Sequence, residues 1–187
     1  MSVRYWGARL SPEALTRLFV ADIEEGIDVN DYGGPEIERT KHRAGLIKIA
    51  SGLDGIDGRE RQVFEATAEA HRVTGAPILT HTEQGTAADA QVELLDRFGV
   101  DLGHVVISHT DRVPDLAYHK DILASGVFVE YDSAFRWKGD AGNPTLELLV
   151  GLKEAGLLGQ TLLRCTRLAV LAELSVFSNW DGLSAVG

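Results

Sequence analysis

Short apolar runs rich in β-branched residues alternate with amphipathic helical segments along most of this chain. This alternation limits the possible folds more than any other feature. Five runs are candidate strands, at residues 46–50, 77–80, 104–108, 127–130 and 160–163. They are short and largely apolar on both faces, which is typical of strands buried in a parallel sheet. Strands separated by single helices with short connections predict an α/β fold built on a parallel sheet.

Five helices are expected before and between these strands. Each is preceded or begun by a residue that favours helix starts, at Ser11, Asp57, Thr86, Pro114 and Asn143. Each is followed by a glycine that favours helix ends, at Gly26, Gly75, Gly99, Gly126 and Gly156. Asp57 and Glu60 have the spacing of a capping box. The polar stretch 28–43 is expected to be a loop.

Two architectures fit this order, an open doubly wound sheet and a closed eight-stranded (β/α) barrel. Nucleotide-binding open sheets carry a Gly-x-Gly-x-x-Gly turn or a phosphate-binding loop after a strand, and this chain has neither. A barrel of the TIM type is therefore favoured. Such barrels need about 250 residues, and this chain has 187. We expect an incomplete barrel with about five of eight βα units.

Composition excludes several classes of function. The net charge is −10 and no cluster of Lys and Arg appears, so nucleic acid is not an expected partner. No apolar run approaches the roughly 20 residues that cross a bilayer, so no membrane partner is expected. The single cysteine, Cys165, and the absence of an apolar leader at the amino terminus indicate a cytoplasmic protein.

Three polar side chains lie near the ends of the first three predicted strands. Lys48 interrupts an apolar run, where a buried lysine needs to be neutralised, paired or modified. His81 and His109 follow at the ends of the next two strands. Each alone would more often be a structural residue. Barrel active sites lie at the carboxyl ends of the strands, so placement on three consecutive strands favours one shared site.

Three acidic residues just past strand ends are weaker candidates for contacting substrate or orienting ligands, namely Glu83, Asp111 and Asp132. Of Glu130 and Asp132, which finish the fourth strand, we expect Asp132 to face the mouth of the barrel. The remaining histidines are interpreted as structural because they fall in helices, in a loop or at the opposite strand end: His42, His71, His104 and His119.

These segments resemble the phosphotriesterase family of the amidohydrolase superfamily. The matching runs are Ala-Gly-Leu-Ile-Lys-Ile-Ala at 44–50, Ala-Pro-Ile-Leu-Thr-His-Thr at 76–82 and Val-Val-Ile-Ser-His-Thr-Asp at 105–111. Residues 18–27 and 126–132 also match. The resemblance covers most of the chain from about Arg4 to Leu163, and the lysine and two histidines in this order are its most specific part.

The resemblance implies a (β/α)₈ barrel with two metal ions, commonly zinc. Lys48 would react with CO₂ to give a carbamate that bridges the metals, and His81 and His109 would bind the second metal. A metal-bound hydroxide would attack a phosphoester, lactone or related ester bond of a small-molecule substrate. In this scheme Lys48 is both a ligand and a catalytic residue.

Two parts of the family's site are missing from this sequence. The family's His-x-His pair on its first strand has no counterpart, and no aspartate follows 160–163, where Arg164 and Cys165 stand. We therefore expect a partial barrel over 1–163 and a divergent tail over 164–187, for which a shifted reading frame is our hypothesis. Unpaired strands at the edges of a partial barrel predict self-association.

Three functional readings follow. The first is a phosphotriesterase-type hydrolase that lacks part of its site. The second is a Schiff-base enzyme in which Lys48 attacks a carbonyl substrate. The third is an inactive fragment that binds metal weakly or not at all.

Overall fold

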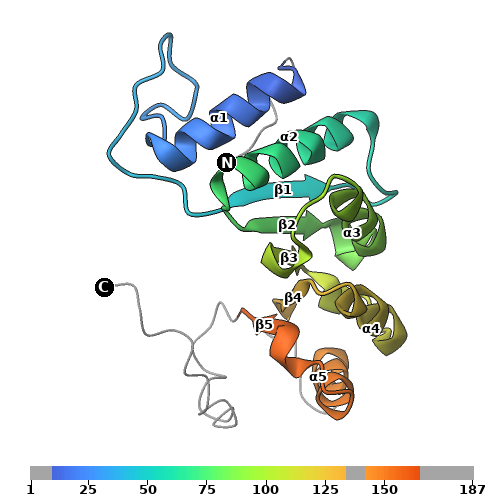
Figure 1. Ribbon diagram of the computed structural model, residues 1–187. Coiled ribbons are helices and arrows are strands. Elements are labelled where there is room, and N and C mark those ends of the chain that lie inside the picture. Colours follow the sequence, from blue (N-terminus) through green and yellow to red (C-terminus); the bar gives the residue numbers. More distant parts are fainter. Residues whose placement is uncertain (1–9, 134–141, 165–187) are drawn as a thin grey trace.

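The structure, a computed structural model, describes residues 10–133 and 142–164. Five parallel strands form one twisted sheet in the order β1-β2-β3-β4-β5, so each strand pairs with its neighbour in sequence (Figure 1). The strands are β1 Ile47–Ser51, β2 Ile78–Thr82, β3 Val105–Ser108, β4 Phe128–Tyr131 and β5 Thr161–Leu163. The predicted parallel α/β fold is confirmed.

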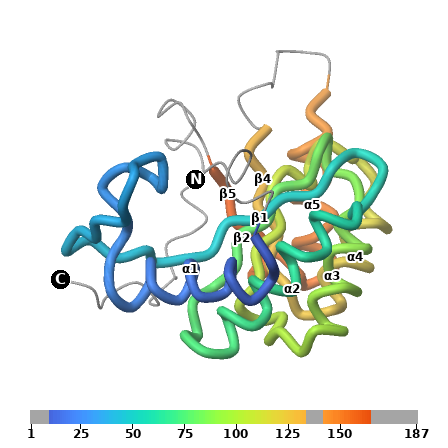
Figure 2. Tube along the Cα trace, turned by 90° about the horizontal axis from the view of Figure 1, so that it is seen from above, coloured from blue at the N-terminus to red at the C-terminus, as the bar shows by residue number. Residues whose placement is uncertain are grey.

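One helix precedes the sheet and four connect or follow its strands: α1 Pro12–Glu24, α2 Gly58–Thr74, α3 Ala88–Arg97, α4 Leu116–Ala124 and α5 Pro144–Glu154. Figure 2 shows α2 to α5 following one another along one side of the sheet. Helix α1 packs on α2. Short 3₁₀ turns fill four connections: η2 Glu83–Gly85, η3 Leu102–His104, η4 Thr110–Arg112 and η7 Leu158–Gln160. None of the described helices is long and apolar enough to cross a membrane.

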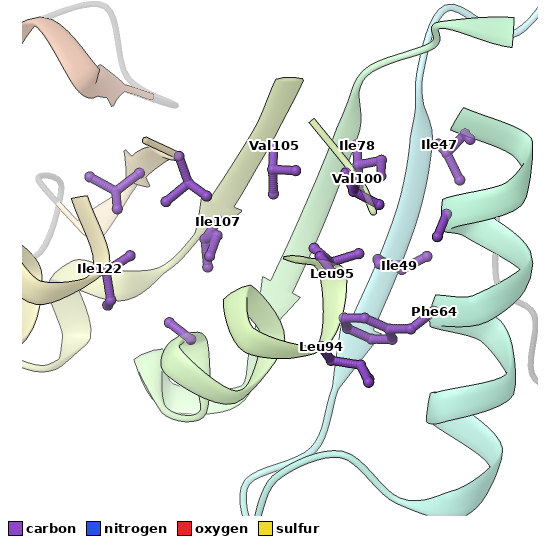
Figure 3. Packing of buried hydrophobic residues seen from close by; sticks show 14 of the residues in the cluster. Ile47, Ile49, Phe64, Ile78, Leu94, Leu95, Val100, Val105, Ile107 and Ile122 are labelled. Carbon is purple, nitrogen blue, oxygen red and sulfur yellow. The ribbon is translucent and has the colours of Figure 1, made fainter. Parts of the chain in front are cut away.

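Alternate strand residues build the core. Ile47, Ile78 and Ile107 point from the sheet into the helical layer, where they meet fully buried residues such as Phe64 of α2 and Leu95 of α3 (Figure 3). The other face also carries apolar residues, as expected, namely Ala50, Leu79, Val106 and Phe128, but they are exposed or half-buried. Exposed or half-buried polar residues of β1, β2 and β4 stand there, and no described helix covers them. One face of the sheet is thus a packed core and the other is open.

Most helix signals act as the sequence indicates. Asp57 and Glu60 form the predicted capping box, in which each side chain accepts a hydrogen bond from the other's backbone N–H at 2.7–2.9 Å. Thr86 does not open α3. Its hydroxyl instead donates to the carbonyl oxygens of Leu53 and Glu83, and α3 begins at Ala88, after the η2 turn.

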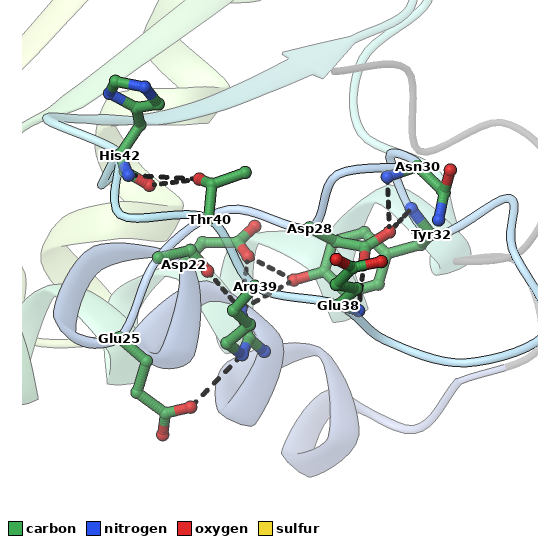
Figure 4. Close-up of polar contacts among 10 residues, drawn as sticks. Asp22, Glu25, Asp28, Asn30, Tyr32, Glu38, Arg39, Thr40 and His42 are labelled. Carbon is green, nitrogen blue, oxygen red and sulfur yellow. Dashed lines mark hydrogen bonds and ion pairs between the residues drawn. The ribbon is translucent and has the colours of Figure 1, made fainter.

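The stretch 28–43 is a loop, as predicted, and carboxylates order it (Figure 4). Asp28 accepts hydrogen bonds from three backbone N–H groups of the loop, at 2.6–3.1 Å. Buried Asp22 of α1 pairs with Arg39 at 3.0 Å and also accepts a hydrogen bond from Tyr32. These contacts fasten the loop to α1.

Candidate metal centre

The sheet places the three predicted ligands near one another at its carboxyl end. Lys48 is the second residue of β1, His81 is the fourth residue of β2, and His109 directly follows β3. The parallel register pairs Ala50 with His81, so His81 lies two residues further toward the carboxyl end than Lys48. Lys48 is therefore not at the end of its strand, as the sequence suggested, but deeper on the open face.

His81 and His109 stand side by side. Their ring centroids are 4.7 Å apart and the rings meet edge-on at 73°. His81 Nε2 lies 3.4 Å from Glu83 Oε2, and His109 Nδ1 lies 2.7 Å from Asp132 Oδ2. Among the described residues, His81 Nδ1 and His109 Nε2 have no polar partner, and the contact of His109 Nδ1 with Asp132 is an ion-pair contact without hydrogen-bond geometry. Each imidazole therefore has one nitrogen beside a carboxylate and one nitrogen available to a ligand.

A left-handed backbone turn brings His109 to this position. Strand alternation alone would direct residue 109 to the same side as Ile107, into the helical layer. His109 instead adopts φ 70° and ψ 13°, while its N–H continues the ladder to the Glu130 carbonyl at 3.0 Å. A non-glycine residue in this conformation costs about 1–3 kcal/mol and persists only where its surroundings enforce it. The placement of this imidazole beside His81 therefore has an unfavourable backbone conformation that tertiary contacts must offset.

The pKa of His81 is lowered, first by burial and then by neighbouring His109 and Lys48, while Glu83 opposes the change. The pKa of Lys48 is lowered by loss of water around its amine, against the attraction of Glu130 and Asp132. The Lys48 residue is exposed overall, on the open face of the sheet. Both shifts favour the neutral forms, which are the forms that bind metals or react with CO₂.

The acidic candidates have different surroundings. Asp132 and Glu83 lie beside the imidazoles, as described above. Asp111 is buried, and its Oδ2 accepts hydrogen bonds from Ser133 N–H at 2.9 Å and Thr145 Oγ1 at 3.2 Å. Burial raises the pKa of Asp111. Its first role is therefore to tie the loop after β3 to the loop after β4 and to α5.

A pocket of about 570 Å³ opens beside Asp111 at the carboxyl end of the sheet. Its lining comes from the segments after β2, β3 and β4 and from the start of α5, and includes Gln84, Arg112 and Ser133. Asp111 Oδ1 has no partner among the described residues.

Two residues of the site were missed by sequence reasoning. Glu130, set aside in favour of Asp132, acts on Lys48 electrostatically. Gln91 of α3 is fully buried, and its Nε2 donates to Ser51 Oγ at 2.6 Å and to the His81 carbonyl at 2.9 Å. It thereby joins the ends of β1 and β2. A glutamine within a helical pattern carries no signal that marks such a role.

The donor set fits part of a metal centre. Over residues 10–133 and 142–164, no three His, Cys, Asp or Glu side chains are grouped to hold a metal ion. What the described chain offers is a pair of adjacent imidazoles with Lys48 behind them. The other four histidines lie elsewhere: His71 and His119 are buried in helices, and His42 and His104 are exposed.

Comparison with known proteins gives the family. The model of the phosphotriesterase family matches residues 3–174. The chain belongs to the phosphotriesterase family. The match includes all three predicted ligands and extends past Leu163, into residues outside the described structure.

Curated relatives include a phospho-furanose lactonase from Mycoplasmopsis synoviae, 37% identical over 134 residues, which are 71% of this chain and 38% of the relative. A phosphotriesterase homology protein from Escherichia coli is 32% identical over 83% of this chain and 50% of its own length. The chain spans half or less of the length of these two relatives.

Solved structures of the family superpose on the described fold. An amidohydrolase from Mycoplasma synoviae matches with a TM-score of 0.80 and 32% identity, over 88% of this chain and 47% of its own. The lactonase Lmo2620 from Listeria monocytogenes matches with a TM-score of 0.72 and 30% identity, over 83% and 44%. The predicted barrel type is confirmed, and the described residues form a partial barrel of five parallel strands.

Proposed function

We propose that this chain carries part of the centre of a metal-dependent hydrolase, with Lys48, His81 and His109 as metal ligands. The observation that carries the proposal is the side-by-side placement of His81 and His109, each with one ring nitrogen beside a carboxylate and the other without a polar neighbour. The expected ion is zinc, because neutral imidazoles and carboxylate-type groups suit it. The expected substrates are small lactones, phosphotriesters or related esters, as the names of the relatives suggest.

The bound metal would polarise the scissile carbonyl or phosphoryl group and activate water. The chain's own residues prepare for it. Asp132 lies beside His109 Nδ1 and favours a proton there, so that Nε2 presents its lone pair. Glu83 acts on His81 Nε2 in the same sense, and leaves Nδ1 as the donor atom. The two imidazoles would therefore bind through different nitrogens.

Lys48 would contribute as a carbamate. The ammonium first loses one proton, and the free amine then adds to CO₂ and releases a second, which converts a cationic side chain into an anionic one. The lowered pKa of Lys48 favours this step because only the unprotonated amine reacts. An anionic group in that position would also remove the like-charge interaction between Lys48 and His81.

Metal analysis of the purified full chain tests the proposal. We expect bound zinc in the wild type, its loss in His81→Ala and His109→Ala, and weaker binding in Lys48→Ala. His42→Ala is the matched control, because His42 is exposed and lies outside the site. A wild type without metal after zinc addition, or equal loss in His42→Ala, would contradict the ligand assignment. Metal binding without turnover of any lactone or phosphotriester would instead support the reading as an inactive fragment.

A Schiff-base enzyme is the second candidate, because a lysine with a lowered pKa is also a competent nucleophile. Borohydride treatment in the presence of carbonyl substrates separates the two. A reduced adduct on Lys48 would favour the Schiff base, whereas a carbamate leaves no such adduct.

We also propose that the partial barrel, 1–163, associates through its sheet edges. In the described residues β1 pairs only with β2, and β5 only with β4. Unpaired edges of this kind recruit further strands, either from another copy or from a separate chain. We further propose that residues 164–187 form a divergent tail; of these residues the structure describes only Arg164.

A further inference from the structure

Helix α4 presents two consecutive ring side chains to the turns behind both imidazoles. Tyr118 Oη donates to the Gly85 carbonyl at 2.9 Å, and His119 Nε2 lies 2.8 Å from the Val113 carbonyl. Gly85 follows His81 by four residues, and Val113 follows His109 by four. One helix therefore fastens the turn that follows each candidate ligand.

The hydrogen bonds fix the protonation of His119. A carbonyl oxygen only accepts, so His119 Nε2 carries the proton and Nδ1 is the acceptor. Tyr131 Oη donates to Nδ1 at 2.8 Å. Both rings are fully buried and meet edge-on at 82°. Burial lowers the pKa of His119, which agrees with a neutral ring that has both nitrogens engaged.

Val113 ends the turn in which His109 has its left-handed conformation. Within that turn Arg112 N–H donates to the His109 carbonyl at 3.2 Å, and Val113 N–H donates to the Thr110 carbonyl at 3.0 Å. The Val113 carbonyl accepts from His119 Nε2 and also from the Asp115 N–H at 2.9 Å, and both hydrogen bonds oppose relaxation of the η4 turn toward an extended chain. Relaxation of that kind would restore strand alternation and turn His109 away from His81.

The two turns also touch each other. A Cβ added at Gly85, whose φ is +82°, would lie 2.9 Å from the His109 carbonyl oxygen and 3.2 Å from that of Thr110. Gly85 thus allows the η2 turn, which follows β2, to approach the η4 turn, which follows β3. The Tyr118 hydroxyl donates to the Gly85 carbonyl, and the same hydroxyl oxygen accepts a hydrogen bond from the Ala88 N–H at 3.1 Å.

We propose that Tyr118 and His119, with Tyr131 behind His119, are positioning residues that hold the imidazoles of His81 and His109 together. Only the expected effect on zinc binding rests on the proposed metal site. Its structural part, the restraint of the two turns, is independent of metal.

Hydrogen exchange on the metal-free full chain tests the restraint directly. His119→Leu should lower the protection of the Arg112 and Val113 amides about tenfold, the equilibrium effect of one lost buried hydrogen bond. Tyr131→Phe should act on the same amides more weakly. Tyr118→Phe should act instead on the Thr86 amide, which donates to Glu83 at 3.1 Å. His119→Gln, which keeps a donor and an acceptor, should recover most of the protection.

His71→Leu is the matched control. His71 is also a buried helical histidine, and its Nδ1 lies 2.9 Å from the Ala76 carbonyl at the opposite end of the sheet. The His71→Leu substitution should destabilise the fold without a selective loss of exchange protection at the η4 amides. Equal loss in His71→Leu and His119→Leu, or unchanged η4 protection in both His119→Leu and Tyr131→Phe, would overturn the inference.

Zinc titration then measures the consequence. We expect His119→Leu to weaken zinc binding about tenfold and His71→Leu to leave it unchanged. If no variant and no wild type binds zinc while the exchange pattern appears, the proposed metal site fails and the positioning role stands. If zinc binds equally to all variants, the restraint does not serve the ligands and the inference fails.

Discussion

Removal of the carboxylate beside His109 should weaken metal binding more than removal of the carboxylate beside His81. The two contacts differ in length and exposure. Asp132 Oδ2 is 2.7 Å from His109 Nδ1, with side chains 17% and 15% exposed. Glu83 Oε2 is 3.4 Å from His81 Nε2, with side chains 49% and 31% exposed. Asp132→Ala and Glu83→Ala therefore form a matched pair of substitutions.

The expected sizes follow from these contacts. A carboxylate that orients a metal-binding imidazole contributes about 10–100-fold to affinity, and Asp132 is half-buried and lies close to His109. An exposed ion pair contributes about 0.2–1 kcal/mol, which is at most about fivefold in affinity. We therefore expect a 10–100-fold loss for Asp132→Ala and a loss of at most about fivefold for Glu83→Ala.

Isothermal titration of zinc into each variant of the full chain measures the difference. Asp132→Asn serves as a further comparison, because it keeps an acceptor oxygen but loses the charge, and it should fall between the wild type and Asp132→Ala. Equal losses in the two alanine variants, or a larger loss in Glu83→Ala, would refute the argument from distance and burial.

Three further predictions concern the scaffold. The pKa of Asp28 is lowered because hydrogen bonds from three backbone N–H groups outweigh the opposing effect of its burial. The stabilisation from Asp28 is therefore complete above about pH 4 and is lost as the pH falls through the lowered pKa of the folded state. Urea unfolding should show Asp28→Asn less stable than the wild type at pH 7, with the difference in unfolding free energy closing in acid, and a constant difference would contradict this. Asp57→Ala removes the capping box of α2 and should cost about 1 kcal/mol by the same method, whereas Gly58→Ala, at a site where no atom lies within 4 Å of an added Cβ, should not destabilise. Multi-angle light scattering should find the chain associated at micromolar concentration, and a stable monomer would exclude the proposed edge pairing.

Much of the fold was predictable because its signals are local. Strand runs, the capping box at Asp57 and the helix-ending glycines each act within a few residues, and the structure has them. Thr86 misled because its hydroxyl found carbonyl acceptors in tertiary structure, which no local pattern reveals. The strand runs are apolar on both faces, but apolar composition alone does not show whether a second layer of structure covers a strand.

The candidate site was predictable in part for similar reasons. Regular strand spacing placed Lys48 and His81 on one face, but strand alternation would have turned His109 away. Its position depends on a left-handed turn that tertiary contacts enforce. Glu130 and Asp132 could not be separated by alternation alone, because the chain leaves the strand between them. The supports from Gln91 and His119 come from helices, where polar residues carry no positional signal.

Long-range ¹⁵N–¹H NMR of the six histidines can show whether His81 and His109 converge on one metal ion. On addition of one equivalent of zinc, only two imidazoles should change, His81 through Nδ1 and His109 through Nε2. His71 and His119 should keep their tautomers, and the exposed histidines should be unaffected. Unchanged spectra for His81 and His109, or binding confined to His42 or His104, would contradict it.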